Sequence, residues 1–384
     1  MKSFGIVNYM EPLPIPGNKY WRAHQIACVL SENGFKCEYY TSSFNHFEKK
    51  YYRQNILNKL NLPFEVYLCG ATRYKNNKSL NRIISNITFS ISLFLKSISS
   101  KRNIWIISYP HSFAIVFLLL SKLFHKKRKI IVDIRDSPFS KVNSLKAKCF
   151  NIFEMFLIEL WIGHIDQFIG MGEEIYLNFP KRYRKYIIPK YFYIPISLKK
   201  QISNSLHIKN YQENNNIIFV GTLTRSFDLH EVILSFLKSS RNNVFHIVGS
   251  GPELSNLKNK FIKNQNIIFH GYKNQSEISY LFANSKFAIL PYSDSDLRFR
   301  NHITNKFPEY LSYGLTTIAP AWCNSMAKVI EINKIGLIYN SYIDLDNIFT
   351  QIEKYSFSKE EIIKVYKNNF SYELFTENIM KLIS

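Results

Sequence analysis

The stretch IIFVGTLTRSFDLHEVILSFLKSS, residues 217–240, has the pattern that decides the fold. It opens with four apolar residues, and Gly221 follows them as at the end of a buried strand. From Leu229 to Phe236, apolar residues recur at i, i+3, i+4 and i+7, the spacing of one helical face. A second apolar run, Val244–Val248, follows this helix. Two short buried strands joined by a helix indicate a parallel β-α-β unit.

The same alternation continues on both sides of this unit. Downstream, the sequence predicts strands at 267–269, 287–290 and 316–319, with helices around 278–283 and 306–313. Upstream, it predicts strands at 4–7, 103–108 and 129–134 and apolar helices at 83–98 and 149–162. No pattern is clear over residues 45–80. Strand–helix alternation of this kind is typical of doubly wound parallel sheets, so the fold class is α/β.

Length and composition add limits to this interpretation. A chain of 384 residues is too long for one hydrophobic core, so we expect two Rossmann-like domains, 1–200 and 205–369, with a cleft between them. The longest apolar run is too short to span a membrane, and the proline-rich start does not resemble a signal peptide. Five scattered cysteines without a C-x-x-C pair exclude a disulfide framework and a cysteine zinc site, and fit a reducing cytoplasm.

The positive charge is concentrated in one half of the chain. Residues 1–200 contain 31 basic and 12 acidic side chains, a net charge of +19, whereas residues 201–384 contain 19 and 16, a net +3. A compositional bias of the genome would affect both halves alike. The first half therefore indicates a polyanionic partner: nucleic acid, anionic lipid or a phosphate-bearing acceptor.

One segment of this half bears on a membrane partner. The apolar run Ser112–Phe124 continues directly into the basic cluster His125–Lys129. A peripheral protein uses this combination on an anionic leaflet, although a buried helix followed by a solvated basic turn has the same pattern. Burial explains the apolar run better than insertion does. Together with the charge of the first half, the cluster nevertheless favours an anionic membrane surface as a partner.

The second half resembles the retaining nucleotide-sugar glycosyltransferases of family four, which have the GT-B fold of two Rossmann-like domains. Four pieces carry this resemblance in order and spacing: IIFVGTL (217–223), FHIVGSGPE (245–253), IIFHGYKNQSEISYLFANSKFAILPY (267–292) and NKFPEYLSYGLTTIAP (305–320).

The first half resembles the same family less specifically. Its first strand, the glycine-bearing loop and the helix after it match, and IIVDIRDSPF (130–139) resembles the Arg-Asp stretch of polysaccharide-assembly members. Asp133, Arg135 and Asp136 of this stretch could also form an ion pair between the domains. FSYELFTENIMKLIS (370–384) resembles the family's final helix, which implies that this helix completes the N-terminal domain.

For the donor, we expect the loop after the 217–220 strand to bind a diphosphate. The departing diphosphate gains negative charge, so cations and backbone N–H groups must meet it. Gly221 and Thr222 allow close approach, and Arg225 offers a bidentate cation. The resemblance places an arginine and a lysine at positions that hold Thr222 and Phe227 here. Either Arg225 replaces them with help from Lys306, or phosphate binding is weaker; a plain turn with a solvated arginine is the alternative.

A second group of candidates surrounds the helix at 306–313. Asn305 can cap it, and by resemblance Glu309 accepts hydrogen bonds from the ribose hydroxyls, although an acid in a first turn also stabilises a helix without a ligand. A second glutamate expected by resemblance is replaced by Asn301, which can still bond sugar hydroxyls. Arg298 and Arg300 nearby either compensate at the diphosphate or belong to a solvated loop.

Three further residues complete the expected sites. Tyr272 occupies the turn where relatives contact the nucleobase, and a core or surface tyrosine is equally consistent with the sequence. Gly17 lets the first loop approach the donor phosphate or sugar. By resemblance, His111 corresponds to a histidine that contacts the transferred sugar, although a lone histidine is more often structural.

The resemblance implies a retaining glycosyltransferase. We expect it to move a sugar from a nucleotide-diphosphate-sugar to a lipid-linked or other saccharide acceptor in lipopolysaccharide or capsule assembly, as a cytoplasmic enzyme peripheral to the inner face of the plasma membrane. Apart from this donor substrate, no cofactor or metal is expected. Two alternatives are an inactive GT-B partner subunit and a basic nucleic-acid-binding protein. The sequence contains no recognised nucleic-acid-binding module, so no nucleic acid is expected as a partner.

Overall fold

The computed structural model describes residues 2–14, 21–76, 79–135, 145–196, 215–239 and 243–384. The chain divides into two compact units. Unit 1 comprises Met1–Met171, Ile175–Ile194 and Thr376–Ser384, and unit 2 comprises Gly172–Glu174 and Pro195–Phe375. Within the described residues, no helix combines the length and the hydrophobicity needed to cross a membrane.

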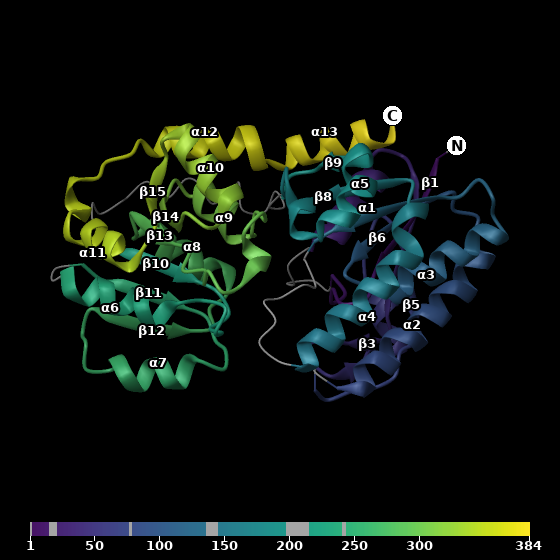
Figure 1. The fold of residues 1–384 in the computed structure, drawn as a ribbon, viewed down its shortest axis with the longest axis horizontal. Coiled ribbons are helices and arrows are strands. Elements are labelled where there is room, and N and C mark those ends of the chain that lie inside the picture. Colours follow the sequence, from purple (N-terminus) through teal and green to yellow (C-terminus); the bar gives the residue numbers. More distant parts are fainter. Residues whose placement is uncertain (1, 15–20, 77–78, 136–144, 197–214, 240–242) are drawn as a thin grey trace. The chain divides into compact units, whose positions relative to one another are not determined.

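Unit 1 is built on a seven-stranded sheet in which every neighbouring pair is parallel (Figure 1). In spatial order its strands are β5 (Glu65–Cys69), β2 (Lys36–Ser42), β1 (Ser3–Asn8), β6 (Ile104–Tyr109), β7 (Lys129–Ile134), β8 (Gln167–Gly170) and β9 (Tyr191–Tyr193). A small antiparallel pair, β3 (Phe44–Asn45) and β4 (Lys50–Tyr51), lies apart from it.

The helices of unit 1 cover both faces of this sheet. Right-handed crossovers place α2, α3, α4 and α5 on one face, because each leads to a strand on the same side along the sheet, whereas α1 leads back from β1 to β2 and takes the other face. Their bounds are α1 (Arg22–Glu32), α2 (Leu80–Ser99), α3 (Ser112–Leu120), α4 (Leu145–Trp161) and α5 (Lys181–Ile187). The short 3-10 helix η2 (Ser121–Leu123) continues α3.

Unit 2 repeats the design with a six-stranded parallel sheet. Its spatial order is β12 (Ile267–Gly271), β11 (Phe245–Val248), β10 (Ile217–Val220), β13 (Phe287–Ile289), β14 (Thr316–Pro320) and β15 (Gly336–Tyr339). Its helices are α6 (Leu229–Ser239), α7 (Leu254–Phe261), α8 (Gln275–Ala283), α9 (Lys306–Ser312), α10 (Asn324–Asn333), α11 (Tyr342–Thr350) and α12 (Lys359–Phe370). The last helix, α13 (Tyr372–Ile383), begins in unit 2, and its residues from Thr376 onward belong to unit 1.

The two parallel sheets confirm the predicted α/β class with two Rossmann-like halves. The strands at 129–134 and 217–220 have the predicted bounds, and Gly34, which follows the first helix, has a φ of +83°. The region 45–80, which had no clear pattern, contains β3, β4 and β5.

The strand order reverses once in each sheet. In unit 1 the chain goes from β1 to β2 on one side and later resumes at β6 on the other side of β1; in unit 2 it does the same at β10 and β13. In open α/β sheets, ligands bind beyond the carboxyl ends of the strands at such a switch point. We therefore expect ligand-binding sites at the loops after β1 and β6 in unit 1 and after β10 and β13 in unit 2.

Candidate functional site

In unit 2, the loop after β10 is held against the loop after β11. The backbone N–H of Leu223 donates to the Ser250 carbonyl at 2.9 Å, and that of Glu253 donates to the Leu223 carbonyl at 3.1 Å. Gly249 has a φ of +137°, and a Cβ there would lie only 1.8 Å from the carbonyl oxygen of Gly221. Only glycine fits at this contact, so Gly249 fixes the shape of the loop that begins at Gly221.

The first turn of α9 is anchored beside the same loop. The Tyr310 hydroxyl accepts a hydrogen bond from the backbone N–H of Val220, the last residue of β10, at 3.1 Å. Glu309 in this turn is only 1% exposed, and its Oε2 lies 3.1 Å from the Nζ of Lys306. Its Oε1 accepts from Gln275 Nε2 at 3.4 Å. The structure thus brings Gly221, Lys306 and Glu309 to one edge of the sheet.

The two other candidates on the loop after β10 are exposed. Thr222 lies at the surface, and Arg225, with a side chain 92% exposed, bonds Glu253 Oε1 through its Nε at 3.1 Å. Phe227 instead packs against Phe219, with ring centroids 5.2 Å apart. The position where the resemblance placed a lysine is therefore part of an aromatic cluster, and Arg225 is the cation that this loop contributes.

The loop after β13 has its own ion pairs. Arg298 forms two hydrogen bonds with Asp296, at 2.5 and 2.8 Å, and one with the Ser226 hydroxyl at 3.1 Å. Burial alone would raise the pKa of Asp296, but the hydrogen bonds and charge of Arg298 outweigh it, and that pKa is lowered. Arg300 pairs with Asp294 at 2.7 Å. Both arginines thus face aspartates of their own loop.

The remaining unit 2 candidates differ in exposure. Asn301 is buried, and its Oδ1 accepts from Asn324 Nδ2 at 3.2 Å. Tyr272 is 81% exposed just after β12. Asn305 does not cap α9 with its side chain, so that prediction was wrong: its backbone, at φ −56° and ψ −28°, is already helical, whereas a capping residue is extended.

In unit 1, His111 lies two residues after the end of β6, at the switch point. Its ring meets the Tyr9 ring edge-on, with centroids 5.5 Å apart. Burial lowers the pKa of His111 to about 3, and the charges of Arg82 and Arg135 add to this effect. The imidazole is therefore neutral near pH 7 and can exchange hydrogen bonds without carrying charge. Gly17, the other acceptor-side candidate, lies outside the described residues.

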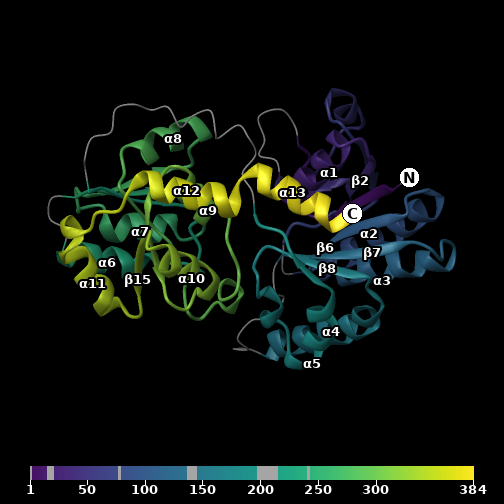
Figure 2. The same ribbon diagram turned by 90° about the horizontal axis from the view of Figure 1, so that it is seen from above.

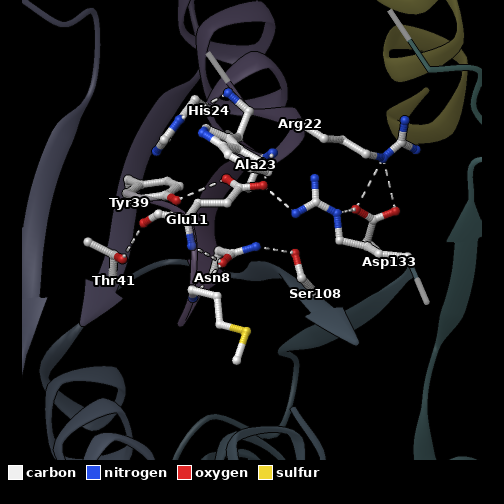
Figure 3. A network of polar contacts seen from close by, with 12 residues as sticks. Asn8, Glu11, Arg22, Ala23, His24, Tyr39, Thr41, Ser108 and Asp133 are labelled. Atoms are coloured by element: carbon white, nitrogen blue, oxygen red, sulfur yellow. Dashed lines mark hydrogen bonds and ion pairs between the residues drawn. The ribbon is translucent and has the colours of Figure 1, made fainter. Parts of the chain in front are cut away.

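Buried ion pairs stand beside the other switch-point strand of unit 1 (Figure 3). The Glu11 carboxylate pairs with Arg135 and accepts from the Tyr39 hydroxyl at 3.2 Å. Asp133 is met by the Nε of Arg22 at 3.2 Å and by the Nε of Arg135 at 3.5 Å. All of these residues belong to unit 1, so the interpretation as a pair between domains is wrong for Asp133 and Arg135. Asp136 lies outside the described residues.

Comparison with known proteins agrees with the resemblance seen in the second half of the chain. Residues 203–370 match the family model described as Glycosyl transferases group 1. This match supports the predicted enzyme class, a retaining glycosyltransferase that uses a nucleotide-sugar donor. No match to a curated protein sequence was found.

Solved structures agree on the fold of this glycosyltransferase over its whole length. The lipopolysaccharide outer core galactosyltransferase WaaB is 13% identical, with a TM-score of 0.67 and coverage of 100% of this chain and 99% of that one. Sucrose-phosphate synthase from Thermosynechococcus elongatus has 11% identity, a TM-score of 0.72 and coverage of 100% and 98%. Anabaena Alr3699/HepE in complex with UDP has 11% identity, a TM-score of 0.68 and coverage of 100% and 99%. The predicted GT-B fold is confirmed.

Two residues of the unit 1 network were not singled out in the sequence of the glycosyltransferase. Glu11 lies just after β1, where its N–H donates to Asn8 Oδ1 at 2.9 Å, and Arg22 is the first residue of α1. The sequence did contain a signal for Glu11: it is an acidic residue directly before a proline-rich stretch, in a half of the chain that has only 12 acidic residues. Across the described residues, no three His, Cys, Asp or Glu side chains gather in a way that could hold a metal ion.

Proposed function

We propose that this glycosyltransferase extends a lipid-linked saccharide during assembly of a surface polysaccharide such as lipopolysaccharide or capsule, at the inner face of the plasma membrane. Support for this acceptor comes from the +19 net charge of residues 1–200 and from the structural likeness to WaaB, a lipopolysaccharide galactosyltransferase by name. A phosphate-bearing acceptor and an anionic leaflet both attract such a surface.

The observation that carries the donor site is the pair of the buried Glu309 with the partly exposed Lys306 beside Gly221, at the switch point of unit 2. Glu309 would accept the ribose hydroxyls, and Lys306 would turn its charge toward the diphosphate together with Arg225. The backbone N–H of Thr222 would assist them, and Gly221, whose own N–H donates to the Val248 carbonyl at 2.9 Å, would allow the phosphate a close approach. Tyr272 would contact the base, and Asn301 and Asn305 would bond hydroxyls of the sugar. These groups meet the negative charge that develops on the β-phosphate as the anomeric bond breaks.

On the acceptor side, the neutral His111 would bond a hydroxyl of the transferred sugar, and Gly17, as a glycine, would allow close approach to the donor phosphate or sugar. The acceptor oxygen forms its bond to the anomeric carbon on the face from which the diphosphate departs. The bond from that carbon to the phosphate oxygen breaks in an oxocarbenium-like state. The acceptor proton passes to the departing β-phosphate oxygen, so no protein carboxylate needs to act as nucleophile.

The test uses the whole chain and a panel of nucleoside diphosphates. Because the Anabaena HepE structures contain UDP and UDP-glucose, UDP is the first ligand to try. A ligand at about 100 times its Kd stabilises the native state by about 2.7 kcal/mol, which a thermal melt detects. Release of sugar from the matching nucleotide sugar, with and without a soluble saccharide acceptor, then measures turnover. Absence of stabilisation and of sugar release across the panel would contradict the proposal.

A further inference from the structure

The large apolar side chains that the structure exposes are concentrated in one part of unit 1. Of the 24 that lie at the surface among the described residues, thirteen lie on α2, on α4, or at the end of α3 and in the turn after it. They are Leu80, Ile83, Ile84, Ile91, Leu95, Leu120, Leu123, Phe124, Phe150, Ile152, Phe153, Phe156 and Leu160. Scattered single residues need no explanation, but a contiguous group of this size marks a contact surface.

Helix α2 has its apolar side turned outward. Leu80, Ile84, Ile91 and Leu95 follow one another at helical spacing on the exposed side, with Leu80 77% exposed. The side packed against the unit includes Ser85, Ser90 and Ser97. The hydroxyls of Ser90 and Ser97 bond carbonyls of their own helix at 2.6 and 2.7 Å. In a water-soluble helix, the apolar stripe faces the core and polar residues face solvent, so α2 has the opposite arrangement in part.

Helix α4 shows the same feature. Phe153, Phe156 and Leu160 lie on its exposed side, while the carboxylate of Glu154 is buried. Glu154 Oε1 accepts from the Ser112 hydroxyl at 2.5 Å and from the Tyr109 hydroxyl at 3.2 Å, so these bonds satisfy the buried group. A helix that only faced water would expose Glu154 and bury the phenylalanines. The observed arrangement is expected if the outer side of α4 contacts an apolar partner.

The three helices form one continuous layer. The rings of Phe94 on α2 and Phe117 on α3 are 6.2 Å apart, and those of Phe113 on α3 and Phe153 on α4 are 5.8 Å apart. All three helices cover the same face of the sheet, where they run beside one another (Figure 1, Figure 2). We name their outer side, with η2 and Phe124, the α2–α4 face.

The charge along α2, α3 and the turn after α3 has one sign, whereas the exposed Glu159 on α4 pairs with Arg182 at 2.8 Å. Residues 66–132 contain twelve lysines and arginines and no aspartate or glutamate. Lys101 and the exposed Lys126, Lys127 and Lys129 follow the ends of α2 and η2, and they meet along one rim because β6 and β7 begin side by side. Arg128 is an exception: it is buried, it lies 5.0 Å from the Trp105 ring, and it bonds the carbonyls at the end of α2.

We propose that the α2–α4 face docks on an anionic lipid bilayer, with its apolar side chains at the boundary of headgroups and acyl chains and its lysine rim on the lipid phosphates. The inference rests on the proposed function only in that a lipid-linked acceptor requires such contact. A second copy of the chain would bring the lysine rim against another like it, and charge complementarity favours an anionic surface instead.

Sedimentation of the full chain with vesicles tests the apolar part, without nucleotide or acceptor. Vesicles of phosphatidylcholine with phosphatidylglycerol are compared with phosphatidylcholine alone. The double variant Leu95→Ser/Phe156→Ser should lower partitioning onto anionic vesicles by at least about tenfold, because each side chain loses apolar burial. The matched control Ile332→Ser/Ile343→Ser removes two equally exposed apolar residues of unit 2 and should bind as the unchanged chain does.

The rim is tested separately by Lys126→Gln/Lys127→Gln/Lys129→Gln. At about 1 kcal/mol per lysine near the surface, partitioning onto anionic vesicles should fall on the order of 100-fold. Lys258→Gln/Lys263→Gln/Lys367→Gln removes the same charge from unit 2 and should have little effect. Unchanged binding by the apolar or rim variant would overturn the proposal. So would no vesicle binding by the unchanged chain, or a dimer in solution that Leu95→Ser/Phe156→Ser dissociates. Sugar release by all variants, measured in parallel, reports on the donor site independently.

Discussion

At the scale of single residues, the Lys306–Glu309 pair makes the sharpest prediction. Glu309→Ala should leave the fold intact, because Lys306 is partly exposed and can be solvated by water. It should weaken stabilisation by nucleoside diphosphates by at least about tenfold in Kd, since hydrogen bonds to an ionised group contribute about 1.5–3 kcal/mol each. Thermal melts at several ligand concentrations measure this. The control Glu331→Ala removes an exposed acid on α10. If nucleoside diphosphates stabilise both variants equally, Glu309 does not bind the nucleotide.

Buried histidines make a second prediction at this scale, on pH. His24 on α1 is fully buried, and burial lowers its pKa to about 4 from the usual 6.5. Since the unfolded chain takes up a proton below pH 6.5 and the native His24 does not, stability is lost as pH falls from about 6.5 toward 4.

This histidine alone should lower the free energy of unfolding by about 2 kcal/mol between pH 7 and pH 5. Denaturant titrations followed by fluorescence of Trp105 and Trp161, both in the core of unit 1, measure the change. His24→Gln should reduce the pH dependence by that amount. An equal loss of stability in the variant and the unchanged chain would show that His24 is already protonated or exposed.

The sequence could predict which residues stand at the donor edge, but not their contacts. Glu309 and Gly221 lie at the ends of well-patterned elements, so their neighbourhood follows from the order of strands and helices. The pairing of Arg225 with Glu253, by contrast, joins two loops 28 residues apart. The Glu11–Arg135 pair joins residues 124 apart, and local patterns contain no information on such pairs.

At the scale of elements, the contact between the loops after β10 and β11 can be tested through its glycine. Gly249→Ala places a Cβ against the Gly221 carbonyl and should cost about 3 kcal/mol or more, with a loss of nucleotide binding as the loop shifts. Gly271→Ala is the matched control. Its φ is also positive, at +66°, but nothing lies within 4 Å of the added carbon, so only about 1 kcal/mol of backbone strain is expected.

Calorimetry and nucleotide titration of both glycine variants measure these effects. Similar losses in the two would mean that backbone conformation, rather than the close approach of the loops, makes Gly249 necessary.

Elements were predictable where side chains gave a clear period. The continuous apolar strands β7 and β10 have the expected bounds, whereas β9 and β15 are short, mostly half-buried and carry no such signal. The helices α2 and α4 were expected from their apolar content. Which side of them faces outward was not, because a stripe of leucine and isoleucine has the same spacing whether it meets a core or a membrane.

At the scale of the molecule, two units with separate cores allow ligand binding to be located. Hydrogen exchange with and without UDP should show protection in unit 2, at 217–228 and 305–313, because both segments flank the proposed donor edge. Strands β2 and β5 of unit 1 should exchange at the same rate in both states. Protection confined to unit 1 would place the nucleotide in the other half of the chain.

The division into two parallel-sheet halves was predictable from length and alternation alone, and so was the uneven charge. Their arrangement into a surface was not. Only the structure shows that the exposed side chains of three helices form one layer bordered by lysines, although the first and the last of them are 80 residues apart in the sequence.

On the proposed docking, the layer of α2, α3 and α4 lies flat on the lipid, and the strands of unit 1 run along the membrane rather than toward it. The edge of the sheet with Glu11 and His111 then stands only one helix thickness, about 10 Å, above the headgroups. A hydroxyl reached at that height belongs to a sugar attached close to its lipid. The enzyme would therefore act early in the growth of a glycan, while the chain is still short.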